Sequence, residues 1–261
     1  MKTSLGIAAI IFALFVCSPT THADIETNSW LLNGSLSISL QERYIGIRVS
    51  RVLYDGVSLW SDLTVNLPKG FYVNVWNHYG IGDRVVSKQP GELDLTLGWR
   101  QSVPWLGLEV GLATTYLNNS PLDLWWERDA WAQSAILSKT YTFGQYTLKP
   151  QLRVEWISRT TDIGGGALVL MPNVSHTWRR VFGIKPLSFI HQIFVIHDDG
   201  FDLPKNDSEG YFLRWNAGLR WQLNKRTILT LPSFIAQVPI HRGDDGRGKA
   251  SSWGSSLVFS F

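Results

Sequence analysis

The stretch W-G-S-S-L-V-F-S-F, from Trp253 to Phe261, decides the fold class of this 261-residue chain. Its large apolar side chains, Trp253, Leu257, Phe259 and Phe261, share one parity, and the other parity carries mainly Ser and Gly. Successive side chains point to opposite faces of a strand, so this stretch predicts a β-strand with one apolar and one small polar face. By itself it leaves two interpretations open, a membrane barrel strand or the last strand of a soluble sandwich.

The first 23 residues have the composition of a secretory signal peptide. Lys2 is the only charged residue before Asp24, and residues 5–17 form an apolar run. That run is shorter than the roughly 20 apolar residues that a membrane-spanning helix needs. We therefore expect residues 1–23 to be a signal peptide and residues 24–261 to be one exported domain. This domain contains no cysteine and hence no disulfide.

Composition narrows the possible functions without deciding the fold. The chain has 13 Trp, 8 Tyr and 12 Phe, but charged residues make up only 17%, below the usual quarter. The net charge of +3 is not gathered into a basic face, which argues against a nucleic-acid partner. Near-zero mean hydropathy fits a barrel whose strands face lipid on one side and a polar interior on the other. A soluble all-β protein has the same average.

Alternating stretches separated by turn residues recur along the whole exported domain. They predict twelve strands, at 34–52, 57–67, 71–80, 92–103, 105–118, 124–140, 146–158, 166–182, 187–198, 210–223, 226–238 and 251–261. A change of apolar parity inside the first of these stretches predicts a β-bulge. Connections after even-numbered strands are short, whereas the others include long ones at 81–91, 199–209 and 239–250. This asymmetry is typical of outer-membrane barrels and favours twelve strands over ten or fourteen.

The two faces of the predicted strands differ in a way that suits a membrane barrel. Five Trp residues lie on apolar faces, where they fit interfacial aromatic girdles better than a sandwich core: Trp99, Trp156, Trp215, Trp221 and Trp253. The polar faces carry ionised groups, four carboxylates against five cations. We predict that this polar face lines a pore, with the candidate residues Asp62, Asn74, Asp94, Arg100, Glu109, Lys149, Gln151, Arg153, Glu155, Arg214, Asn216 and Arg220.

Two parts of the chain resemble known protein families. The final strand resembles the C-terminal signal of bacterial outer-membrane β-barrels, in which Trp253, Leu257, Phe259 and Phe261 would be read by the barrel assembly machinery. The segment 44–116 contains R-x-S (48–50), D-G (55–56), G-F-Y-x-x-V-W (70–76) and E-L-D-L-T-L-G-W (92–99). In these motifs it resembles the TorF-type porins of Gram-negative bacteria, which implies an outer-membrane barrel but no particular solute.

The sequence therefore predicts an all-β protein, a transmembrane antiparallel β-barrel of about twelve strands in the bacterial outer membrane. We expect a porin, a passive channel for small polar solutes or ions, and no enzyme, cofactor or metal site. Outer-membrane lipid and lipopolysaccharide, the assembly machinery and small polar solutes are the expected partners, and nucleic acid is not. The alternatives are a non-conducting barrel with a structural or lipid-processing enzymatic role, and a soluble periplasmic β-protein.

Overall fold

The computed structural model describes residues 33–47, 52–81, 91–118, 129–159, 166–198, 210–241 and 249–261. The expected signal peptide and most of the long predicted loops lie outside these ranges. Among the described residues, no helix is both long enough and apolar enough to cross a membrane.

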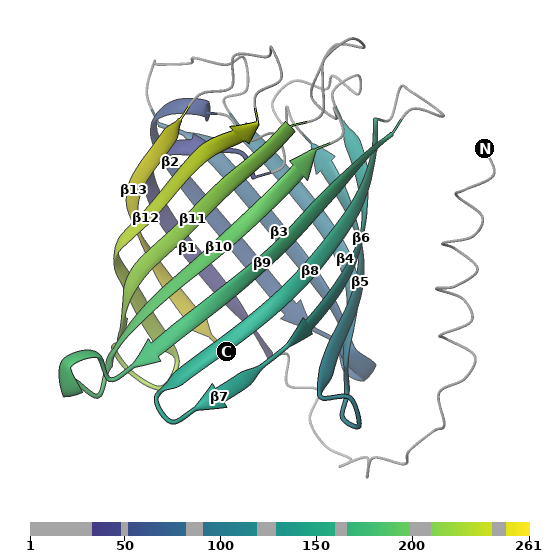
Figure 1. Cartoon of the computed structure of the whole chain (residues 1–261). Coiled ribbons are helices and arrows are strands. Elements are labelled where there is room, and N and C mark those ends of the chain that lie inside the picture. Colours follow the sequence, from purple (N-terminus) through teal and green to yellow (C-terminus); the bar gives the residue numbers. More distant parts are fainter. Residues whose placement is uncertain are drawn as a thin grey trace. The chain divides into compact units, whose positions relative to one another are not determined.

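Antiparallel strands form a single closed sheet (Figure 1). Each long strand pairs with the long strands before and after it in the sequence, and the first strand also pairs with the last. The strands are β1 Asn33–Ile45, β2 Val52–Asn66, β3 Phe71–Gly80, β4 Gly91–Val103, β5 Leu108–Asn118, β6 Ala130–Lys139, β7 Tyr141–Phe143, β8 Tyr146–Arg159, β9 Ala167–Arg179, β10 Leu187–Asp198, β11 Gly210–Gln222, β12 Thr227–His241 and β13 Ala250–Ser260.

The short strand β7 continues β6 and is not a separate crossing. Both strands pair with β8 in one register, since Ser138 lies opposite Gln151 and Tyr141 lies opposite Leu148. The chain therefore crosses the sheet twelve times, and each predicted strand corresponds to one crossing. The prediction of a twelve-stranded antiparallel barrel is confirmed.

The prediction was wrong about the first hairpin. The prediction left residues 53–56 as the connection between its first two strands, but these residues, including Asp55 and Gly56, lie inside β2. Asp55 faces Arg43 across the ladder, and its carboxylate accepts a hydrogen bond of 2.7 Å from the Arg43 Nε atom. Because Asp55 has this ion-pair partner within the sheet, Asp55 and Gly56 continue the strand and do not form a turn.

A bulge explains the change of apolar parity in β1. Register shifts occur before Arg43 and after Tyr44, and Glu42 is left without a direct partner in β2. Before the bulge, Ile38 and Leu40 are exposed on the outer face. After it, Tyr44 is buried on the inner face. The extra residue thus turns the end of β1 inward; the sequence predicted the bulge but not this inward turn.

Large apolar side chains cover the outside of the barrel. Leu97 and Trp253, for example, expose 53% and 54% of their surfaces. All five Trp residues that the sequence placed on apolar faces lie on the outward parity of their strands. Such a surface would be unstable in water but suits hydrocarbon, so the chain is a transmembrane barrel.

One rim of the barrel has short connections. Two of them contain 3-10 turns, η1 Pro68–Gly70 and η3 Val181–Gly183, and the others span 104–107, 144–145 and 223–226. These turns lie at the lower rim in Figure 1. We refer to this rim as the short-turn rim. It matches the predicted short connections after even-numbered strands.

Phe261 closes the barrel where β13 meets β1. Its backbone N–H donates to the Gly34 carbonyl at 3.1 Å, and the Gly34 N–H donates to the Phe261 carbonyl at 3.0 Å. A Cβ on Gly34 would lie 2.1 Å from the Thr64 carbonyl oxygen, so only glycine fits at this seam.

Deleting Phe261 should lower the yield of assembled barrel, because both seam hydrogen bonds and the terminal aromatic ring are lost. A Phe261→Ala variant keeps the backbone bonds and isolates the ring. Heat-dependent gel mobility of membrane fractions measures the folded amount. If both variants assemble as well as the wild type, Phe261 is no assembly signal.

Candidate functional site: the barrel lumen

All twelve predicted pore-lining residues share the inner face of the barrel. Residues that pair directly across a ladder project to the same side. The pairs that link these positions run through every strand from β2 to β11, for example Asn74 with Thr96, Ser138 with Gln151 and Gln192 with Asn216. The fully buried Glu155 lies on this face, whereas its neighbour Trp156 is exposed outside.

The structure joins most of the predicted residues into local pairs, not into one site. Asn74 Nδ2 donates to Asp62 Oδ1 at 2.6 Å, and Arg214 Nε donates to Asn216 Oδ1 at 3.1 Å. Two ion pairs complete the set, Lys149 with Glu109 and Arg153 with Glu155. These contacts satisfy much of the inward charge, as a narrow lumen requires.

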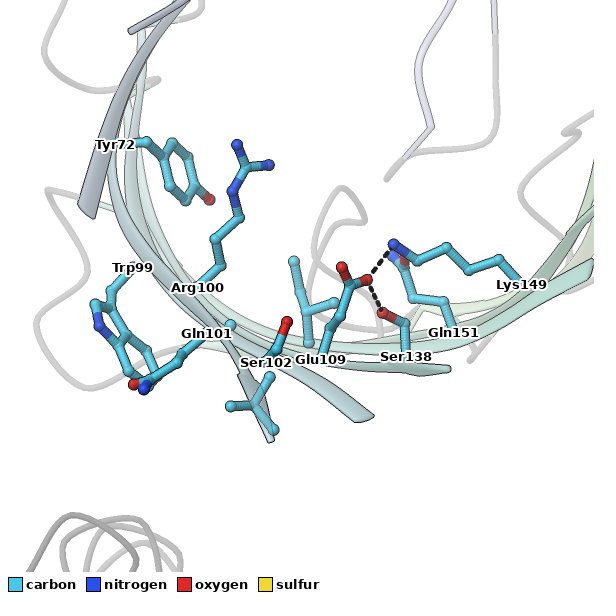
Figure 2. A pocket seen from close by; sticks show the side chains of 12 residues that line it. Tyr72, Trp99, Arg100, Gln101, Ser102, Glu109, Ser138, Lys149 and Gln151 are labelled. Carbon is cyan, nitrogen blue, oxygen red and sulfur yellow. Dashed lines mark hydrogen bonds and ion pairs between the residues drawn. The ribbon is translucent and has the colours of Figure 1, made fainter. Parts of the chain in front are cut away.

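A cavity of about 360 Å³ opens near the short-turn rim. Its lining includes Tyr72, Arg100, Glu109, Lys149 and Gln151. In Figure 2 the side chains of Arg100, Glu109 and Lys149 extend from the same, concave side of the wall, and Trp99 lies on the opposite side. The polar half of the lumen therefore contains open space as well as paired charge.

Glycine and tyrosine shape one side of this cavity. A Cβ on Gly98 would lie 2.2 Å from Cζ of Tyr72, so the missing side chain leaves room for the tyrosine ring. The guanidinium of Arg100 lies 5.4 Å from the centre of that ring, a cation–π distance. Arg100 Nη2 also donates to Asn66 Oδ1 at 2.6 Å. The ring and the amide hold the guanidinium in a fixed position beside the cavity.

An apolar layer lines part of the lumen toward the other rim. We call it the inner apolar layer; it is a cluster of buried inward side chains from six strands: Leu117, Ala130, Ala132, Ile157, Val169, Met171, Phe194, Ile196 and Phe212. A second cluster of rings lies on the inner side of β1–β3. It contains Tyr44, Tyr54, Trp60, Trp76 and His78, with Tyr44 stacked on His78 at 4.2 Å.

The end of β1 bends into the lumen at this level and leaves its place in the wall. The carbonyl of Ile45 accepts a hydrogen bond of 3.0 Å from Arg214 Nη1 on β11, although two strands separate β1 from β11 in the sheet. Ile47 packs against the inner apolar layer. Figure 1 shows this purple part of the chain bending at the upper rim. Together, the apolar layer and the tucked segment 45–47 form a constriction.

The sequence pattern missed the constriction, although it contained a signal for it. Trp60 and Phe212 stand on the polar parity of otherwise clean strands. On β10, Phe194 and Ile196 alternate with Ile193 and Val195, so both faces of this strand are apolar. Apolar residues on both parities indicate that part of the interior is packed, not wet.

Among the described residues, no three His, Cys, Asp or Glu side chains are grouped so that they could hold a metal ion. The predicted connection 199–209, which contains four acidic residues, lies outside the described residues. The candidate site is therefore defined by charge, cavity and constriction.

The comparisons with known proteins agree on the fold. No family model matches the chain, and no curated protein sequence matches it. The structure is similar to the NanC porin, with a TM-score of 0.55 and 9% identity over 87% of this chain and 100% of that one. It is similar to the KdgM porin, with a TM-score of 0.53 and 8% identity over 87% of this chain and 99% of that one. It is also similar to an outer membrane channel from Pseudomonas putida F1, with a TM-score of 0.54 and 9% identity over 93% of this chain and 100% of that one.

Proposed function

We propose that this chain is an outer-membrane channel of Gram-negative bacteria that passes small polar solutes or ions passively. The observation that carries the proposal is the inner face itself. Inward positions from β2 to β11 present charged and amide side chains to an interior that contains a cavity, while the outer face is apolar. Groups of this kind replace the hydration of a passing solute.

The similar solved structures support this proposal. The three solved structures compared above are porins or outer membrane channels. A further KdgM porin structure, with a TM-score of 0.51, is described as a complex with disordered oligogalacturonate. For the present chain the proposed partners are small polar solutes, with lipid and lipopolysaccharide around the barrel and the assembly machinery acting on β13. Its proposed role is transport and not catalysis.

The constriction limits what such a channel passes. Apolar segments of a lumen can exclude water and so gate conduction. Segment 45–47 and Phe194 narrow the lumen in the half away from the short-turn rim. We therefore propose low conductance and passage of small solutes only, and the same constriction favours the non-conducting barrel as the alternative.

Planar-bilayer recording of the purified, folded barrel tests the proposal. We expect discrete conductance steps that are small compared with those of a general diffusion porin in the same salt. Folding is checked beforehand by heat-dependent gel mobility. A correctly folded barrel that stays electrically silent, in the wild type and in variants with a reduced constriction, would favour the structural or enzymatic alternative.

A further inference from the structure

Four inward-facing cations, from four different strands, lie near the short-turn rim of the lumen, and two of them line the cavity described above. Arg100, Lys149, Arg179 and Arg220 each lie within three residues of the strand end at that rim and share the inward parity. Within the same distance of the rim, Glu109 is the one inward carboxylate among the described residues. This end of the lumen is therefore strongly cationic.

Three of these four cations form no ion pair with a carboxylate among the described residues, although the charge of Arg100 still acts on Glu109. Lys149 is paired with Glu109. Arg100 and Arg179 donate to neutral oxygens instead, Asn66 Oδ1 at 2.6 Å and Thr147 Oγ1 at 2.9 Å. Arg220 has neither a hydrogen bond nor an ion pair with any described residue. All three guanidinium groups thus keep donors available for another partner.

The arginines at the rim are exposed to the lumen, unlike the arginine at the constriction. Arg100, Arg179 and Arg220 are exposed, whereas Arg214 is buried and bound to Ile45 and Asn216. Farther from the rim, inward carboxylates such as Asp94 and Glu155 outnumber the cations. The positive charge is therefore concentrated at one end, where solvent reaches it.

We propose that the short-turn rim of the lumen is a binding site for small oxyanions, the carboxylate or phosphate groups of a solute. A guanidinium presents paired N–H donors in a plane, which match the two oxygens of an oxyanion better than a spherical anion. Tyr72 and Asn66 hold Arg100 in place, so less entropy is lost when it binds. This inference rests on the proposed lumen and names the class of solute that it favours.

Equilibrium binding of inorganic phosphate to the folded barrel in detergent tests this site without any need for conduction. Phosphorus NMR line broadening is titrated at constant ionic strength with chloride as the competing anion. We expect saturable binding that chloride displaces poorly. The variant Arg100→Gln, Arg179→Gln and Arg220→Gln should weaken it about tenfold or more, because charge-assisted hydrogen bonds are lost.

The matched control removes three cations from the short turns outside the lumen, Lys69→Gln, Arg180→Gln and Lys185→Gln. This control should bind phosphate as the wild type does. Equal loss in both triple variants, equal competition by chloride, or full binding by the lumen variant would each overturn the proposal. If the lumen variant does not fold, the single variant Arg220→Gln replaces it, with a several-fold weakening expected and unchanged binding as the contrary result.

The result of the phosphate-binding experiment can be told apart from the result of the conductance experiment that tests the proposed function. A barrel that conducts but binds phosphate no better than chloride keeps the channel and loses the oxyanion site. A barrel that binds phosphate through these arginines but never conducts keeps the site and loses the channel.

Discussion

Replacing Phe194 and Phe212 with alanine should raise the conductance of the reconstituted barrel several-fold. Both rings belong to the inner apolar layer, and Ile47 packs on that layer from the opposite wall. Removing the rings widens the constriction and makes an apolar segment of the lumen easier for water to enter. Single-channel recording in a planar bilayer measures the change.

The matched control is the pair Phe189→Ala and Phe234→Ala. These rings lie on the same or a neighbouring strand, β10 and β12, but on the outward parity, where they do not touch the lumen. The control should conduct like the wild type. If the inner and outer pairs change conductance equally, the apolar layer does not limit passage and the constriction lies elsewhere.

Replacing Glu155 with alanine should lower the free energy of unfolding by about 3 kcal/mol. Glu155 is fully buried, where it is paired with Arg153 and accepts a hydrogen bond of 2.9 Å from Ser134. Breaking a buried pair costs about 3–5 kcal/mol. The lower end applies because the Arg153 side chain is 30% exposed and can still reach water. Urea unfolding followed by tryptophan fluorescence gives the value.

Glu109→Ala serves as the comparison. It removes the same type of side chain and also breaks an ion pair, but the Glu109 side chain is 49% exposed. Exposed pairs contribute about 0–1 kcal/mol, so this variant should unfold almost like the wild type. Similar losses of unfolding free energy in both variants would show that the burial of Glu155 does not determine how much it contributes to stability.

The alternation of apolar and polar residues predicted the barrel well, because one face of every strand must be apolar to contact the hydrocarbon of the membrane. Leu95 and Leu97 had to face outward once Asp94 was placed inside, and turn residues then fixed most strand ends. This reasoning misplaced the first connection, because Asp55 lies inside β2 and pairs with Arg43 on the neighbouring strand. A local turn signal cannot reveal a pairing that depends on register.

The candidate site was predicted only as a set of inward residues. Parity tells which face a side chain occupies, and all twelve candidates lie on the inner face. It does not tell that Lys149 meets Glu109 from another strand, or that Ile45 reaches Arg214. The first contact depends on the ladder register, and the second on a bulge that turns the end of β1 inward.

The seam between Gly34 and Phe261 has a consequence for the order of events in folding. These two positions lie almost at opposite ends of the barrel sequence, so their hydrogen bonds can form only when every intervening strand is in place. Pairing over such sequence separation is slow. Until then β1 and β13 each carry an unsatisfied edge, which in lipid costs several kcal/mol per backbone group. A half-built barrel with both edges uncovered is therefore unstable in the bilayer core, and we expect closure of the seam to accompany insertion.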